Sequence, residues 1–134
     1  ATLDEIASVA ALAQCLVTHI GEMIDAGTPI QTPPRWILRE NKWLAARYGL
    51  EAPIVTDVVG HRQVVRDAVL DLIDMLAPVA SRLGCSDELA NVARILDHGA
   101  SYQRQRRVFE QTGSLARVVD NLATELETGR PNRS

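Results

Sequence analysis

Cationic and aromatic side chains gather on one predicted helix in the first half of the chain. Successive residues of an α-helix are about 100° apart, so Arg35, Arg39 and Lys42 share one face. Both tryptophans of the chain, Trp36 and Trp43, lie beside these cations. Forked guanidinium groups arranged in this way can bind a phosphate or a carboxylate. The alternative is a surface helix whose Arg and Lys side chains cover the indole rings, with cation–π contacts of about 0.5–1 kcal/mol each.

Arg47 and Asn41 complete the set of candidate residues on this helix. Arg47 falls beside the cationic face, near Trp43. Asn41 falls on the other, apolar side, among residues such as Ile37 and Leu44. An amide in apolar surroundings needs hydrogen-bonding partners, and either a ligand or a neighbouring stretch of backbone can provide them.

The remaining polar residues show no pattern typical of catalysis. Arg104, Arg106 and Arg107 form a second basic cluster, which we expect to be exposed to solvent or paired within the chain. The three histidines lack the spacing of a zinc site, so no metal ligands are assigned. Cys15 and Cys85 are predicted to be separate, buried free thiols in a reducing cytosol. The sequence contains no catalytic triad, P-loop or dinucleotide-binding motif, and no catalytic residue is assigned.

Composition predicts a soluble, cytoplasmic protein with one hydrophobic core. The chain has 134 residues, of which 46% are hydrophobic. No uninterrupted apolar run approaches the ~18 residues that cross a bilayer, so we expect no membrane partner. The net charge of −3 provides no general attraction for nucleic acid.

Residue periodicity predicts a mainly α-helical fold of five to six helices with one small β-hairpin. Thr2 and Glu5 form a capping box that begins a long amphipathic helix. β-Branched residues on both sides of Gly60 predict the hairpin. Pro78 is expected to kink or divide the helix that follows. The predicted helices cover residues 3–26, 33–48, 64–83, 86–98, 102–111 and 115–126, the hairpin lies within 52–65, and a single domain of residues 1–128 precedes a disordered tail, 129–134.

The stretch from Arg39 to Leu50, Arg-Glu-Asn-Lys-Trp-Leu-Ala-Ala-Arg-Tyr-Gly-Leu, resembles a known enzyme family. It is similar to the C-terminal part of the bacterial carboxylate–amine ligases, also called glutamate–cysteine ligase type 2. Their pattern is arginine, any residue, asparagine, a basic residue, tryptophan, an alanine-rich stretch and glycine. Residues 76–85 and 104–120 agree with the family in the same order, and the resemblance extends from about residue 3 to residue 127.

The resemblance implies that this chain is the helical C-terminal part of a larger glutamine-synthetase-like α+β enzyme. Such an enzyme uses ATP to activate the γ-carboxylate of glutamate as an acyl phosphate, and Mg²⁺ offsets the charge on the transferred phosphoryl group. The acyl group then passes to the amine of cysteine or to another amine. In the family the metal-binding carboxylates come from a curved antiparallel sheet, which has no equivalent in this sequence. We therefore expect ATP and Mg²⁺ to bind the complete enzyme, and the isolated chain to be inactive.

The resemblance also implies roles for single residues. Arg39 and Asn41 match the family pattern and are the candidates for contact with substrate or phosphate. Lys42, Trp43 and Arg47 are the candidates for supporting them. The expected partners are the remainder of the same polypeptide, the glutamate and amine substrates, and further copies in a homo-oligomer. The alternative function is a stand-alone helical protein-interaction module without catalytic activity.

Overall fold

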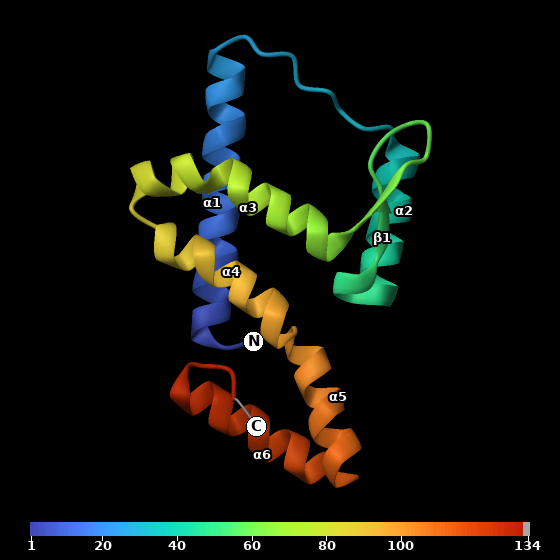
Figure 1. Cartoon of the computed structure of the whole chain (residues 1–134), viewed down its shortest axis with the longest axis vertical. Helices are drawn as coiled ribbons and strands as arrows, with labels where there is room; N and C mark the ends of the chain where they lie inside the picture. Colours follow the sequence, from blue (N-terminus) through green and yellow to red (C-terminus); the bar gives the residue numbers. More distant parts are fainter. Residues whose placement is uncertain (133–134) are drawn as a thin grey trace.

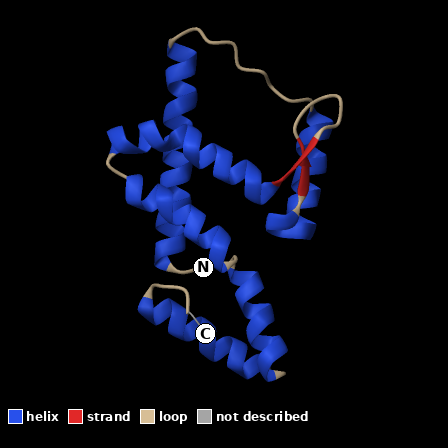
Figure 2. Cartoon of the chain, viewed as in Figure 1, coloured by secondary structure: helices blue, strands red, loops and turns tan. Residues whose placement is uncertain are grey.

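The computed structural model describes residues 1–132 and is mostly helical (Figure 1). This part of the chain contains six α-helices, one short 3₁₀ helix and a two-stranded sheet, drawn in red in Figure 2. The predicted fold class is therefore confirmed. The helices are α1 (Leu3–Asp25), α2 (Arg35–Tyr48), η1 (Gly49–Glu51), α3 (Val65–Leu83), α4 (Ser86–His98), α5 (Ser101–Thr112) and α6 (Leu115–Thr128), and the strands are β1 (Pro53–Val55) and β2 (Arg62–Val64).

The capping box predicted at the start of α1 is present. The Thr2 amide donates a hydrogen bond of 2.7 Å to Glu5 Oε2, and the Glu5 amide donates one of 3.3 Å to Thr2 Oγ1. Each residue thus satisfies an amide that the first turn of a helix leaves without a partner. Thr2 and Glu5 are both buried, so this cap lies inside the protein and not on its surface.

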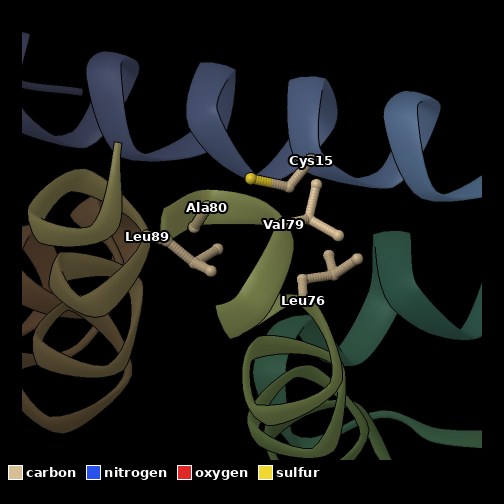
Figure 3. Close-up of a cluster of buried hydrophobic side chains, with 5 residues drawn as sticks. All are labelled: Cys15, Leu76, Val79, Ala80 and Leu89. Atoms are coloured by element: carbon tan, nitrogen blue, oxygen red, sulfur yellow. The ribbon is translucent and has the colours of Figure 1, made fainter. Parts of the chain in front are cut away.

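The hydrophobic core forms where α3 and α4 cross α1 (Figure 1). Cys15 on α1 packs against Leu76, Val79 and Ala80 of α3 and against Leu89 of α4 (Figure 3). Four of these five side chains expose 2% or less of their surface, and Val79 exposes 3%. The three helices therefore form the stable centre to which the other elements attach.

Pro78 lies inside α3 and was predicted to kink or divide this helix; the helix is not divided. A single α-helix runs from Val65 to Leu83. Proline donates no hydrogen bond to the carbonyl four residues earlier, which here belongs to Asp74. The buried neighbours Leu76, Val79 and Ala80 lie on both sides of Pro78, and their packing in the core holds the helix together.

The predicted hairpin is confirmed and rests on α2. Strands β1 and β2 are antiparallel, with Ile54 opposite Gln63. In the turn between them, Asp57 Oδ1 accepts hydrogen bonds from the amides of Val59, Gly60 and His61 at 2.9–3.1 Å. Strand β1 packs against α2, and β2 leads directly into α3. The hairpin thus connects α2 to the core.

Helices α5 and α6 form a helical hairpin that packs mainly on itself, below the crossing of α1, α3 and α4 in Figure 1. After α6 the chain folds back: the Asn132 amide donates to Glu125 Oε1 at 3.1 Å, and its side chain donates to Asn121 Oδ1 at 2.8 Å. The tail that was predicted to be disordered begins at residue 129. Its first four residues fold back so that Asn132 reaches α6. Residues 133–134 of that tail lie outside the described part of the chain.

Helix α1 has apolar side chains on two sides. The side that faces away from the core carries Leu3, Ile6, Val9, Val17, Ile20 and Ile24, which expose between 38% and 71% of their surface. By length and composition, α1 could cross a membrane, with a mean hydropathy of 1.4 over 18 residues. This is a weak indication, because a core helix of a soluble protein or an N-terminal signal sequence meets the same criterion.

Candidate anion-binding site on α2

Helix α2 attaches to the protein by a narrow apolar side and exposes the rest. It begins after Pro34, whose φ of −54° suits a helix start, and it buries only Ile37 and Leu44. Such limited burial leaves the opposite face open to solvent or to another part of a larger protein. The candidate cations lie on that open face.

Arg39 lies in an open depression that Trp36, Glu40 and Trp43 also line. The two tryptophans expose 51% and 55% of their surface, which is unusual for the largest apolar side chain. Within residues 1–132, no side-chain hydrogen bond or ion pair involves Arg35, Arg39 or Lys42. The donors of these three cations are therefore available to an anion, and the indole rings form an apolar surface beside them.

Asn41 does not share this open face. Its Nδ2 donates a hydrogen bond of 2.8 Å to the carbonyl of Val55, and its Oδ1 accepts one of 2.7 Å from the amide of Val55. Of the two sources of partners considered from the sequence, the neighbouring backbone is the one observed. The Asn41 side chain pairs with the free backbone edge of β1 as a neighbouring strand would, and it thereby fixes the hairpin to α2.

Arg47 and Trp43 are in contact with each other. The Arg47 guanidinium lies 5.7 Å from the centre of the Trp43 ring and 5.6 Å from that of Tyr48. The two rings meet edge to face, with centroids 6.2 Å apart. Cation–π contacts of this kind orient both aromatic side chains. Arg47 therefore holds Trp43 in place at the border of the depression around Arg39.

The glycine that ends the motif is required by a contact with a distant helix. Gly49 has a φ of 60°, a backbone conformation that other residues rarely adopt. A Cβ atom at this position would collide with the hydroxyl of Tyr102 on α5. A side chain at residue 49 would therefore be strained and would displace the Tyr102 ring from its place against the end of α2.

A buried ionic cluster lies at the other end of the molecule and was not predicted as a cluster. Arg104 of α5 donates to Glu5 Oε1 at 2.6 Å, to Glu125 at 2.8 and 3.1 Å, and to the carbonyl of Gly99 at 2.8 Å. The three charged residues expose only 3–5% of their surface. The sequence contained one indication, because Glu125 has helical spacing with the apolar residues Val118 and Leu122.

Hydrogen bonds and charge pairing favour the charged forms of Glu5 and Arg104 despite their burial. Burial raises the pKa of Glu5, but hydrogen bonds from Arg104 and the Thr2 amide outweigh it, so the pKa lies below its ordinary value. Burial acts on Arg104 in the opposite sense, and hydrogen bonds to Glu125 and Glu5 raise its pKa above the ordinary value. These hydrogen bonds join α1, α5 and α6, and Glu5 and Arg104 also line an open pocket together with Ser8, Asn91 and Arg94.

The basic residues near Arg104 are also engaged within the chain. The Arg106 guanidinium lies 5.7 Å from the centre of the Tyr102 ring, and Arg107 Nη2 donates to the carbonyl of His98 at 2.7 Å. Within residues 1–132, no group of three or more His, Cys, Asp or Glu side chains is arranged to hold a metal ion. The carboxylates of the described residues therefore form no complete metal-ligand set of their own.

Helical architecture, the α2 motif and sequence comparison together define the class of this protein. The family model of glutamate–cysteine ligase family 2 (GCS2) matches residues 1–121. The chain belongs to this family. No solved structure matches it.

Curated relatives extend the match to nearly the whole chain. A protein of Frankia alni named "Putative glutamate--cysteine ligase 2-1" is 53% identical over 131 residues, which are 97% of this chain and 34% of the relative. A protein of the same name in Arthrobacter sp. strain FB24 is 51% identical over 130 residues, with 96% and 34% covered. The chain thus spans about a third of the length of the relatives that it matches.

Proposed function

We propose that this chain is the helical C-terminal portion of an ATP-dependent carboxylate–amine ligase that forms γ-glutamylcysteine. The observation that carries this proposal is the match to GCS2 over residues 1–121, in a chain that spans only 34% of relatives named as glutamate–cysteine ligases. A helical portion of this size supplies one surface that packs against the rest of the enzyme, and it does not contain the whole catalytic centre. The isolated chain is therefore inactive.

The available cations on α2 support a role in binding an anion. Joining a carboxylate to an amine requires activation of the carboxylate, and ATP supplies this activation when it is bound. Both the phosphate groups of ATP and the carboxylate of glutamate are anions that a forked guanidinium binds through two hydrogen bonds. Arg39 is exposed and lines the depression beside the two tryptophans, with Lys42 and Arg35 on the same face, so it is the residue to which we assign this contact.

Asn41 and Arg47 act on the site through their neighbours. Both polar atoms of the Asn41 amide are bonded to Val55, so the side chain positions β1 against the helix that carries Arg39. Arg47 positions Trp43. No step is assigned to Mg²⁺ here, because the carboxylates of this chain form no ligand set within its described residues.

Substitution of Arg39 in the complete polypeptide tests the proposal. Loss of a charge-assisted hydrogen bond costs roughly 1.5–3 kcal/mol, so Arg39→Ala should lower the rate of γ-glutamylcysteine formation about ten- to a hundredfold with little change in Tm. Arg39→Lys keeps the charge but loses the planar fork, and it should retain a substantial defect. Arg117→Ala, which removes an exposed arginine from α6, is the matched control.

Two results would contradict the proposal. If Arg39→Ala turned over at the parental rate and merely melted earlier, α2 would be a structural helix. If the isolated chain released phosphate from ATP in the presence of glutamate, cysteine and Mg²⁺, and if this activity survived further purification, the chain would contain a catalytic site of its own.

A further inference from the structure

Two thiols from distant parts of the sequence meet at the edge of the hydrophobic core. Cys15 lies in the middle of α1, and Cys85 lies in the turn between α3 and α4, 70 residues later. Their Sγ atoms are 3.6 Å apart. The sequence predicts two separate thiols, but the packing of α1 across α3 and α4 brings them together.

The surroundings of the pair favour a direct reaction between the two sulfurs. Cys15 belongs to the buried core cluster, and Cys85 packs against the same cluster, so the two Sγ atoms are in contact. A disulfide requires an S–S distance of about 2.05 Å. Rotation of the two cysteine side chains about χ1 can bring the Sγ atoms from their present separation to this distance. We infer that Cys15 and Cys85 are a covalent modification site, which forms a reversible intramolecular disulfide when the protein meets a small-molecule disulfide.

The two thiols differ in exposure, and this difference sets the order of the reaction. Cys15 exposes none of its surface, whereas Cys85 is only partly buried. Burial, and then the neighbouring Cys85, raise the pKa of the Cys15 thiol, so Cys15 stays protonated and unreactive towards reagents in solution. A small disulfide must therefore react first with Cys85.

The reaction balances as two successive exchange steps. The Cys85 thiol releases its proton to solvent, and its sulfur attacks one sulfur of the small disulfide RSSR. The S–S bond of RSSR breaks, a mixed disulfide Cys85–S–S–R forms, and one thiolate RS⁻ leaves. Cys15 then loses its proton, and its sulfur attacks Sγ of Cys85, which forms the internal disulfide and releases the second RS⁻. The protein dithiol is oxidised by two electrons, and RSSR with the two protons becomes two RSH.

The disulfide would tie α1 to the turn between α3 and α4 and enclose residues 15–85 in a covalent loop. This loop contains α2, the hairpin and α3, so oxidation restricts the unfolded chain over half of its length. Neither cysteine lies on α2, so the modification uses no residue of the anion-binding site proposed above.

Treatment of the folded chain with 2-hydroxyethyl disulfide tests the inference. Intact mass should fall by two hydrogens, and a non-reducing peptide map should contain one fragment that links Cys15 to Cys85. The oxidised protein should melt roughly 10 °C higher than the reduced protein, because a cross-link over a long loop lowers the entropy of the unfolded chain. A phosphine reductant should reverse both changes.

Two variants separate the steps. Cys15→Ala should keep a stable hydroxyethylthio adduct on Cys85, because the second step has lost its nucleophile. In folded Cys85→Ala, the one remaining thiol, Cys15, should not react, because it is buried. Circular dichroism verifies that both variants keep the helical fold. A stable adduct on Cys85 of the unmodified sequence, disulfides formed only between chains, or no reaction at either thiol would each overturn the inference.

Discussion

Asn41 illustrates how a single side chain in the family motif serves the fold. Its amide makes two hydrogen bonds to one residue of the backbone, Val55, in the manner of a neighbouring strand. Strand β1 has only three residues and pairs with one other strand, so it depends on this contact to stay on α2. The asparagine in the motif is therefore explained by the attachment of the hairpin.

Replacement of Asn41 should destabilise the chain more than an ordinary surface change. Asn41→Ala leaves the amide and the carbonyl of Val55 without these partners, which should lower the free energy of unfolding by about 2 kcal/mol in urea denaturation. Gln14→Ala removes an exposed amide from α1 and should change this free energy by less than about 0.5 kcal/mol. Equal effects of the two substitutions would show that the Val55 contact contributes nothing.

At the scale of whole elements, the helical hairpin α5–α6 is fastened by charge. Its packing is mainly internal, and the Arg104 cluster connects it to the start of α1. A buried ion pair is costly to break, because removal of one member leaves the other charges buried and unpaired. The position of this hairpin therefore depends on the charge state of Glu5 and Glu125.

Removal of Arg104 should be strongly destabilising at neutral pH. Arg104→Leu leaves two buried carboxylates facing each other and should cost about 3–5 kcal/mol in the free energy of unfolding. Arg106→Leu removes only a contact with the partly exposed Tyr102 and should cost less than about 1 kcal/mol. Thermal and chemical denaturation of both variants measure the difference.

The loss of stability in Arg104→Leu should depend on pH. The pKa of Glu5 lies below its ordinary value of 4.5 in the folded protein, so its ion pair stabilises fully above that value and is lost as the pH falls through the folded pKa. Without Arg104, Glu5 loses the hydrogen bond and the charge that chiefly lower its pKa, and burial favours its protonated form more strongly, although the Thr2 amide still acts against it. The gap in stability between the parent and Arg104→Leu should therefore narrow below about pH 4.5. A constant gap from pH 7 to pH 3 would contradict this account.

On the scale of the whole molecule, the outer side of α1 is an apolar face without a partner among the described residues. A helix with apolar side chains on two sides is usually covered on both. The first Lys or Arg of the sequence is Arg35, so α1 lacks the cations by which surface helices bind anionic membranes. The relatives are about three times as long as this chain, and in the longer polypeptide proposed above the additional residues are available to cover this side.

Without such a cover, the isolated chain should self-associate through α1. Light scattering across a range of concentrations should reveal a dimer or larger species, because exposed apolar patches promote association. Val17→Glu places a charge in the middle of the patch and should shift the profile towards the monomer. Val59→Glu adds the same charge to the equally open hairpin turn and should not. A monomer at every concentration would contradict this prediction.

Local sequence features predicted the elements better than the contacts between them. The capping box at Thr2 and the β-branched residues around Gly60 act over a few positions, and they located α1 and the hairpin. Pro78 does not divide α3, because its local cost is offset by burial of neighbours on this helix, which depends on tertiary packing. The Cys15–Cys85 contact and the Arg104 cluster join residues far apart in sequence, and no local pattern specifies such pairs.

The two oxygens of Glu5 have different partners: one accepts from the Thr2 amide in the helix cap, and the other accepts from Arg104. Local and long-range structure therefore share a single side chain, and neither bond can be optimised independently. If the α5–α6 hairpin detaches, Glu5 loses the charge that holds it, and the first turn of α1 is free to fray. If that turn frays first, Arg104 loses one of its two counter-charges. The beginning of the first helix and the docking of the last two should consequently open and close as one cooperative unit.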